Sequence, residues 1–224
     1  MEQHDIWTAV DTYFAGRLVG TDPRLDVVSA NARAAGLPEY QVSELQGAFL
    51  RIVVMMTGAS RVLEVGTLGG YSTVWLAGAL PDGGTVVTIE ADPDHAAVAQ
   101  RSFRECGLND RIDLHRGDAS SVLDAMIDAA EAPFDLVFID ADKRSNAAYL
   151  QKSLRLCRPG SVIITDNVVR DGRVIDEDDQ DPSVIGVRTF VDRLGGESRL
   201  VSTAIQTVGT KGYDGFTVSV VRGT

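Results

Sequence analysis

The sequence has few of the residues that support thiol or histidine chemistry. Its two cysteines, Cys106 and Cys157, each fall late in a predicted helix, and nothing pairs either with a catalytic histidine, so we expect free, buried thiols. The three histidines, His4, His95 and His115, are spread over a terminus, a helix and a strand, and we expect ordinary surface or edge residues. The chemistry of the chain must therefore rest on other side chains.

Positive charge and long apolar runs are also scarce. The 21 lysines and arginines are outnumbered by 32 aspartates and glutamates, and the net charge of -11 opposes binding to nucleic acid or to an anionic membrane. No apolar run approaches the roughly 20 residues that span a bilayer, and the first residues lack a basic segment followed by an apolar one. We expect a soluble, cytoplasmic protein that acts on small molecules.

What the sequence does contain is a regular alternation of predicted strands and helices from residue 61 onward. Strands are predicted at 61–65, 85–90 and 111–115 and in the apolar runs within 134–140 and 161–167, with helices at 72–80, 93–106, 120–130 and 145–157 between them. This order is typical of a doubly wound parallel sheet. With 44% hydrophobic residues and no linker, the 224 residues are predicted to form a single domain, 1–224.

The two ends of the chain depart from this alternation. The first forty residues are predicted to be helical, and a capping box at Ser43–Gln46 starts a helix that carries one apolar face of Leu45, Phe49, Ile52, Val53 and Met56. At the other end, residues 199–206 and 215–222 are β-rich runs joined without a helix, which predicts a hairpin. The predicted fold is therefore α/β and Rossmann-like: a doubly wound, mostly parallel sheet with an antiparallel C-terminal hairpin and helices on both faces.

Two of the apolar runs end in side chains that carry ligand oxygens. Asp140 follows the first run, and Asp166 and Asn167 end the second. Because parallel strands end at the same edge of a sheet, these three groups are expected to converge where open α/β sheets bind ligands. Two clustered carboxylates would repel each other unless a cation lay between them. We therefore predict a divalent cation site, with Mg²⁺ favoured and Ca²⁺ or Mn²⁺ as alternatives.

A glycine-rich turn at 66–70 predicts a second ligand at the same edge. It follows a predicted strand that contains Glu64, and Ser72 stands at the next helix start. Glu90 ends the next strand, where an acid can accept hydrogen bonds from both hydroxyls of a ribose. The glycine spacing is not that of a dinucleotide site, and Glu64 would oppose a pyrophosphate, so a cationic cofactor such as S-adenosylmethionine (SAM) fits better. Asp118 would then lie beside the adenine.

In order along the chain, these motifs resemble those of the cation-dependent class I SAM O-methyltransferases, nearest to the caffeoyl-CoA type and its bacterial homologues, with catechol O-methyltransferase more distant. The resemblance covers residue 43 to the C-terminus and rests on Glu64-Val-Gly-Thr, Gly70-Tyr-Ser72, Gly117-Asp-Ala119, Phe138-Ile-Asp-Ala-Asp-Lys143 and Asp166-Asn167.

The resemblance implies a set of site residues. Metal ligands are implied at Asp140, Asp166 and Asn167. The cofactor set, to which Asp118 and Asp140 are added from their positions, is Val42, Glu64, Gly66, Thr67, Ser72, Glu90, Asp118, Ala119 and Asp140. Plant enzymes of this family often carry aspartate at the position of Glu90, so this chain differs from them there but keeps an acid.

The same resemblance implies the reaction. A methyl group would pass from SAM to one hydroxyl of a catechol-like, vicinal dihydroxy aromatic molecule whose two oxygens bind the metal. Lys143 would accept the hydroxyl proton or stabilise the phenolate, so Lys143 and Asp140 are the predicted catalytic residues. The helices within residues 1–57 would contribute to the substrate pocket and to a dimer contact, and a homodimer is expected.

Other interpretations of the same residues remain open. Asp142 is a more natural helix cap than a metal ligand, and the acidic segment 171–182 is either a solvated loop or a lid over the substrate. Trp75 and Tyr149 are expected to pack in the core. Two other functions compete with methyl transfer: a nicotinamide-dependent oxidoreductase, which the position of Glu90 permits, and a SAM-binding protein without turnover.

Overall fold

A computed structural model describes residues 3–223 and places seven strands in one sheet. The strand order is β3-β2-β1-β4-β5-β7-β6. The bounds are β1 (Arg61–Val65), β2 (Thr85–Glu90), β3 (Ile112–Arg116), β4 (Phe134–Ile139), β5 (Cys157–Asp166), β6 (Leu200–Gly209) and β7 (Gly212–Val221). Strands β1 to β5 pair in parallel, whereas β7 runs antiparallel to both β5 and β6. The predicted mixed sheet with its C-terminal hairpin is confirmed.

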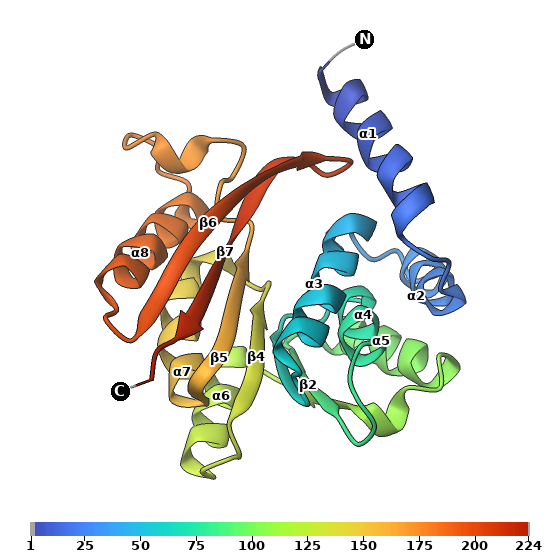
Figure 1. The fold of residues 1–224 in the computed structure, drawn as a ribbon, viewed down its shortest axis with the longest axis horizontal. Coiled ribbons are helices and arrows are strands. Elements are labelled where there is room, and N and C mark those ends of the chain that lie inside the picture. The colour runs from blue at the N-terminus through green and yellow to red at the C-terminus, as the bar shows by residue number, and fades with distance from the viewer. Residues whose placement is uncertain (1–2, 224) are drawn as a thin grey trace.

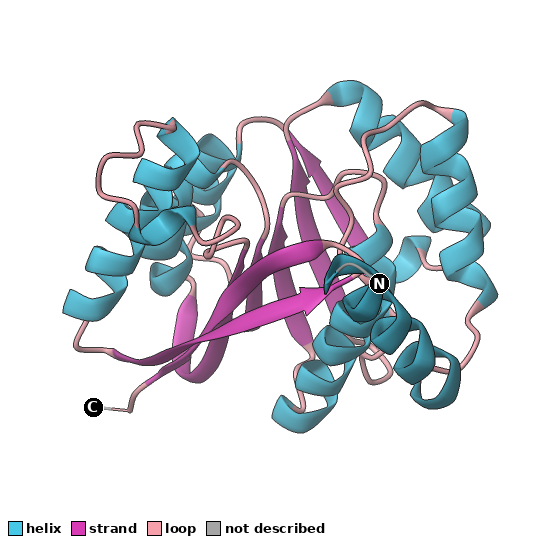
Figure 2. Cartoon of the chain, turned by 90° about the horizontal axis from the view of Figure 1, so that it is seen from above, coloured by secondary structure: helices cyan, strands magenta, loops and turns pink. Residues whose placement is uncertain are grey.

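Helices cover both faces of this sheet, as Figures 1 and 2 show. Helices α2, α3, α4 and α5 lie on one side and α6, α7 and α8 on the other (Figure 1). The bounds are α1 (Gln3–Leu18), α2 (Pro23–Ala34), α3 (Glu44–Thr57), α4 (Tyr71–Ala77), α5 (Pro93–Glu105), α6 (Ala119–Asp128), α7 (Asn146–Arg155) and α8 (Pro182–Gly196). Three short 3₁₀ helices, η1 (Asn109–Arg111), η2 (Lys143–Ser145) and η3 (Arg173–Ile175), join them. Helix α8 lies in a stretch for which no element was predicted from the sequence.

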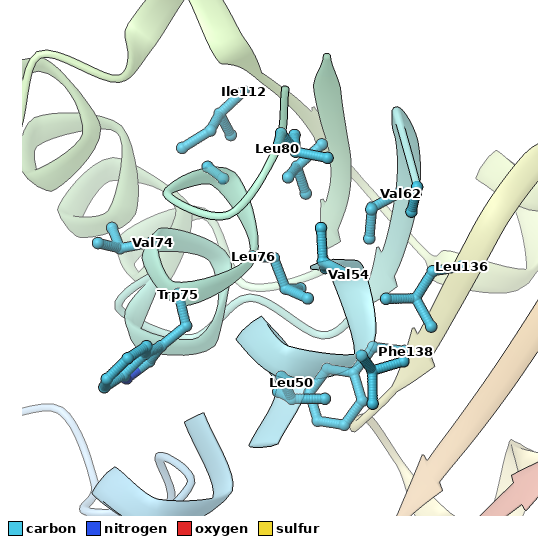
Figure 3. Packing of buried hydrophobic residues seen from close by; sticks show 14 of the residues in the cluster. Leu50, Val54, Val62, Val74, Trp75, Leu76, Leu80, Ile112, Leu136 and Phe138 are labelled. Carbon is cyan, nitrogen blue, oxygen red and sulfur yellow. The ribbon is translucent and has the colours of Figure 1, made fainter. Parts of the chain in front are cut away.

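Alternate residues of the central strands enter two separate cores. Val62 and Leu136 face helices α3 and α4 (Figure 3), whereas Leu63 and Val137 face the other layer of helices. All four side chains are fully buried, which explains why these strands read as continuous apolar runs. Each buried aliphatic side chain contributes about 2 kcal/mol of transfer free energy, and the sheet is therefore a rigid platform for the residues at its edge.

Side-chain caps fix the starts of helices α2 and α3, of which the start at Ser43 was predicted from the sequence. Asp22 accepts the Arg24 N–H at 3.1 Å at the start of α2, where Pro23 is the first helical residue. Ser43 accepts the Gln46 N–H at 3.2 Å and so starts α3 directly above the sheet edge. This cap matters for function because it fixes the loop that precedes α3.

The predicted apolar face of α3 is only partly right. Val53 is buried as expected, but Ile52 and Met56 are exposed, and Leu50 and Val54 enter the core in their place. The helix is apolar around most of its circumference, so residue spacing alone does not show which face meets the core.

Two expectations about composition can be checked against the fold. Both cysteines are free thiols and each is half-buried; burial raises the pKa of Cys157 to about 12, so its thiol stays protonated. Trp75 and Tyr149 are buried packing residues, as predicted. Across residues 3–223, no helix combines the length and the hydropathy that crossing a membrane requires.

Helix α3 approaches α4 closely only because residue 47 is glycine. A Cβ added to Gly47 would lie 2.2 Å from Nε1 of the Trp75 indole ring. We predict that Gly47→Ala lowers the free energy of unfolding by about 1 to 3 kcal/mol, measured by urea denaturation, because a packed helix pair must separate. Gly16→Ala in α1 is the matched control, since no atom lies within 4 Å and alanine favours the helix. Equal losses in both variants would contradict this account of α3 packing.

Candidate active site

A single large cavity lies at the carboxyl edge of the parallel strands, with a volume of about 1170 Å³. Its wall includes the loop before α3, the glycine-rich turn, the ends of β2, β4 and β5, and the tip of the β6–β7 hairpin. Every predicted site residue except Glu64 lines it: Val42, Gly66, Thr67, Ser72, Glu90, Asp118, Ala119, Asp140, Lys143, Asp166 and Asn167. The cavity therefore joins the predicted cofactor end to the predicted metal end.

The glycine-rich turn and the end of β4 are in direct contact. Gly66 has φ of +98°, and a Cβ there would lie 2.1 Å from the Asp140 carbonyl oxygen. Only glycine allows this approach. Backbone hydrogen bonds fix it further, because Gly66 N–H donates to the Ile89 carbonyl and Asp140 N–H donates to the Val65 carbonyl. The two halves of the cavity are thus held at one fixed separation.

Glu90 organises the turn that it faces. Its Oε2 accepts the N–H groups of Thr67 at 3.1 Å and Leu68 at 2.7 Å, and its Oε1 accepts the Asp92 N–H at 2.9 Å. The carboxylate is 9% exposed and lines the cavity, where it remains an acceptor for further donors. His95 lies 3.8 Å from Oε1. This structural role for Glu90 was not predicted from the sequence.

Glu64 lies behind the cavity wall and does not face it. Its side chain is fully buried and accepts three hydroxyl hydrogen bonds, and its predicted contact with a cofactor stays a prediction. Ser72 donates to Oε1 at 2.7 Å, and Thr73 and Thr88 donate to Oε2 at 2.5 and 2.6 Å. Burial raises the pKa of Glu64 to about 7 despite these donors. Of this group Ser72 lines the cavity, so Glu64 acts there through the serine that it orients.

The predicted metal ligands meet at the other end of the cavity. Lys143 Nζ donates to Asp140 Oδ1 at 2.7 Å and is only 9% exposed. Asp166 is 3% exposed; burial, and then the charge of Asp140, raise its pKa to about 7. Asn167 follows with φ of +55°, in the left-handed region. Within residues 3–223 no group of three His, Cys, Asp or Glu side chains could hold a metal, so any cation here would use the Asn167 amide.

Two other aspartates have structural roles. Asp118 caps α6 by accepting the Ser121 N–H at 2.9 Å and its hydroxyl at 2.8 Å, and these bonds lower the Asp118 pKa. Asp142 is exposed at the start of η2 and accepts the Ser145 hydroxyl at 2.9 Å. The interpretation of Asp142 as a helix-start residue fits this contact.

The acidic segment 171–182 packs away from the cavity. None of its residues is part of the cavity wall. Arg173 binds Asp179 and Asp181, and Arg188 of α8 donates to the carbonyl groups of Asp176 and Asp179. In this structure the segment is tied to itself and to α8, which is the solvated-loop interpretation and not the lid.

The part of the wall formed by the β6–β7 hairpin and its neighbours comes from residues far apart in the sequence. At the hairpin tip, Thr210 N–H donates to Asp11 of α1 at 2.9 Å, and Lys211 donates to the Glu39 carbonyl at 2.8 Å. Phe216 of β7 stacks on Phe49 of α3, with ring centroids 4.9 Å apart. Sequence reasoning missed all of these because no local pattern reports a pairing across such separations.

Comparison with known proteins identifies the enzyme class. The family pattern described as "O-methyltransferase" matches residues 23–219. The chain belongs to the O-methyltransferase family. It is 45% identical over 222 residues to the catechol O-methyltransferase of Mycobacterium tuberculosis, covering 99% of each chain, and 41% identical over 219 residues to that of Niastella koreensis, covering 98% of this chain and 99% of the relative.

Solved structures agree with this assignment. The O-methyltransferase from Bacillus cereus in complex with SAH is 48% identical, with a TM-score of 0.95 and coverage of 98% of this chain and 100% of the other. The predicted family, fold class and enzyme class are confirmed. Membership of an O-methyltransferase family also excludes the alternative of a nicotinamide-dependent oxidoreductase. The individual roles of the site residues stay predictions.

The buried Glu64 should make the stability of this O-methyltransferase depend on pH. Its pKa is about 7 when folded and 4.5 as a free side chain, so the folded protein binds the proton more tightly. Its contribution is full below the unfolded pKa and is lost as pH rises through about 7. We predict that the unfolding free energy of the wild type, relative to Glu64→Gln, falls by about 2 to 3 kcal/mol between about pH 5 and pH 8.

Urea denaturation of both proteins at the two pH values measures this difference. Other titrating groups, Asp166 included, are present in both proteins and cancel. A gap between wild type and Glu64→Gln that is the same at both pH values would show that Glu64 is ionised throughout.

Proposed function

We propose that this O-methyltransferase moves a methyl group from SAM to one hydroxyl of a catechol-like acceptor with the help of a divalent cation. The observation that carries the proposal is the cavity that joins the glycine-rich turn and Glu90 to Asp140, Asp166 and Asn167. Its volume of about 1170 Å³ is ample for a nucleoside cofactor and a small aromatic together. Relatives at 41% and 45% identity that carry the name catechol O-methyltransferase support the same acceptor class.

The cofactor would occupy the end of the cavity between Val42 and Ala119. Glu90 has acceptor capacity left for the ribose hydroxyls, and Asp118 and Ala119 stand at the end of β3, where the adenine would lie. Ser72, held by Glu64, is available to the amino acid portion. Structures of relatives with SAH and with SAM, at 48% and 43% identity, support a cofactor of this kind.

The donor set fits a hard divalent cation. Asp140, Asp166 and Asn167 offer two carboxylates and an amide oxygen, the ligand types that Mg²⁺ prefers, with Mn²⁺ and Ca²⁺ as alternatives. Burial, and then the Asp140 carboxylate, raise the pKa of Asp166, and a bound cation would favour the ionised form of both carboxylates. When bound, the cation would act as a Lewis acid that holds the two neighbouring hydroxyls of the acceptor and makes one of them more acidic.

Lys143 would remove the proton of the reacting hydroxyl. Its amine lies at the cavity wall beside Asp140, and in its neutral form it can accept that proton. The oxygen then attacks the methyl carbon of SAM, the carbon–sulfur bond breaks, and its electron pair stays on the sulfur of S-adenosylhomocysteine. The protein supplies alignment of the reactants and exclusion of water.

We predict methyl transfer to vicinal dihydroxy aromatics in the presence of Mg²⁺ and little transfer to their monohydroxy analogues. Chelation of the metal should abolish activity, and Asp166→Asn or Lys143→Met should lower kcat/KM on the order of 100-fold or more, because each removes a group that acts on the reacting oxygen. Mass spectrometry of the products, with and without EDTA, measures this.

Asp110→Asn is the control, since this carboxylate is exposed in η1 and lies outside the cavity. Calorimetric titration with Mg²⁺ separates the variants further: Asp166→Asn should lose the metal and Lys143→Met should keep it. Full activity in EDTA together with full activity of Asp166→Asn would contradict the metal-dependent mechanism.

We also propose that the chain forms a homodimer through its N-terminal helices. Helix α1 has no buried residue and stands away from the body of the molecule in Figure 1, beside the β6–β7 tip. One side of it exposes the apolar face Ile6, Val10, Tyr13, Phe14 and Leu18. A lone helix of this length is marginal in water, and an apolar face of this size needs cover. A second copy, which presents the same face, is the simplest cover.

A double variant tests this interface. We predict that Val10→Glu with Phe14→Glu shifts the protein from dimer to monomer in size-exclusion chromatography with light scattering, because four charges would be buried in a symmetric contact. Thr12→Glu, on the opposite side of the same helix, should leave the dimer intact. A wild type that is monomeric at all concentrations would contradict the proposal.

A further inference from the structure

Arg170 has donors for which the protein provides no acceptor. Among residues 3–223 it is the only arginine that is partly buried and whose side chain makes no hydrogen bond to a described residue. Its Nε is buried without a partner, and the side chain as a whole is 29% exposed. A guanidinium carries five N–H donors, and leaving the buried Nε–H unpaired away from water costs free energy. Such a group is suited to a ligand.

The nearest carboxylate does not satisfy Arg170. Asp214 uses its Oδ1 to accept the backbone N–H groups of Val169 at 2.9 Å, Arg170 at 3.1 Å and Gly215 at 2.9 Å. Its Oδ2 lies 4.0 Å from Arg170 Nη1, which is an ion-pair distance but too long for a hydrogen bond. Asp214 therefore fixes the backbone of the loop and leaves the guanidinium donors free.

The backbone of this loop is strained in a way that fixes Arg170 relative to the metal end. Asn167, Arg170 and Asp171 have φ of 55°, 56° and 56°, three of the five non-glycine residues with positive φ among the residues described. Such conformations are unfavourable for residues other than glycine and persist where the surrounding structure imposes them, often at functional sites. Here they set the position of Arg170 three residues after a predicted metal ligand.

Arg170 lines the same cavity as the predicted metal ligands Asp166 and Asn167. Lys211 at the hairpin tip is a second cationic side chain in the wall. The wall also carries acidic side chains, of which Asp214 beside Arg170 and Asp11 beside the hairpin tip already accept backbone N–H groups.

We propose that Arg170 binds a carboxylate on the methyl acceptor, so that the preferred acceptor is a vicinal dihydroxy aromatic acid and not a neutral catechol. This inference rests on the proposed function, since it names the acceptor of that same site. An arginine forms two parallel, charge-assisted hydrogen bonds with a carboxylate, which no neutral substituent can match. Arg170 would thus be a specificity-determining residue, separate from the groups that act on the hydroxyl.

The experiment compares 3,4-dihydroxybenzoate with its neutral isostere 3,4-dihydroxybenzamide. The wild type should prefer the acid by at least about tenfold in kcat/KM, as expected for hydrogen bonds to a charged group. In Arg170→Met the acid should lose at least about tenfold more than the amide, mainly through KM, and Arg170→Lys should restore part of the preference. Arg155→Met, at an exposed position of α7 outside the cavity, should leave the acid-to-amide ratio unchanged.

Calorimetric titration of the acid and the amide into the protein, with S-adenosylhomocysteine and Mg²⁺ present, gives a readout that does not depend on turnover. The wild type should bind the acid more tightly than the amide, and Arg170→Met should not. Equal losses for acid and amide in Arg170→Met, or no preference in the wild type, would overturn the inference. If the wild type methylates neither compound, the proposed function fails, and the titration still decides the role of Arg170.

Discussion

The parallel pairing of β4 with β1 on one side and with β5 on the other is the constraint on which the whole site depends. Ile139 is paired with Val65 in one neighbour and with Thr165 in the other, so Asp140 and Asp166 leave the sheet at one edge. A slip of one residue in either pairing would turn one of these carboxylates toward the opposite face. The glycine-rich turn, the proposed metal ligands and the loop that carries Arg170 all begin within a few residues of these paired strand ends.

This arrangement concentrates negative charge where water is largely excluded. Glu64 and Asp166 both have pKa values raised to about 7, and Lys143 is the buried basic side chain beside Asp140. Burying these carboxylates costs free energy. The burial of apolar side chains in the two cores beneath them offsets that cost. The two ligands proposed for the cavity, a sulfonium cofactor and a divalent cation, both bring positive charge, so their binding would stabilise the folded protein as well as serve the reaction.

The parts of the site that follow from strand ends could be predicted from the sequence, and the parts set by long-range packing could not. Asp140, Asp166 and Glu90 were predicted because short apolar runs and the edge rule for parallel strands are local signals. The buried position of the Glu64 side chain depends on hydroxyl donors in α4 and β2. The unpaired donors of Arg170 depend on Asp214 of β7, which binds backbone N–H groups instead. The buried face of helix α3 was predicted only in part for a related reason. The helix is apolar on two sides, and tertiary packing decides which side is buried.

The contact between Asp11 and Thr210 spans 199 residues of sequence. It ties the first helix of the chain to its last hairpin across the mouth of the cavity. During synthesis the strands and turns of the cofactor side emerge early and can pair with one another, whereas the acceptor wall is finished only when the final strand has been released and has inserted beside β5. The wall of the cavity is therefore complete only after β7 has inserted beside β5, so the proposed acceptor end forms later than the strands of the proposed cofactor end.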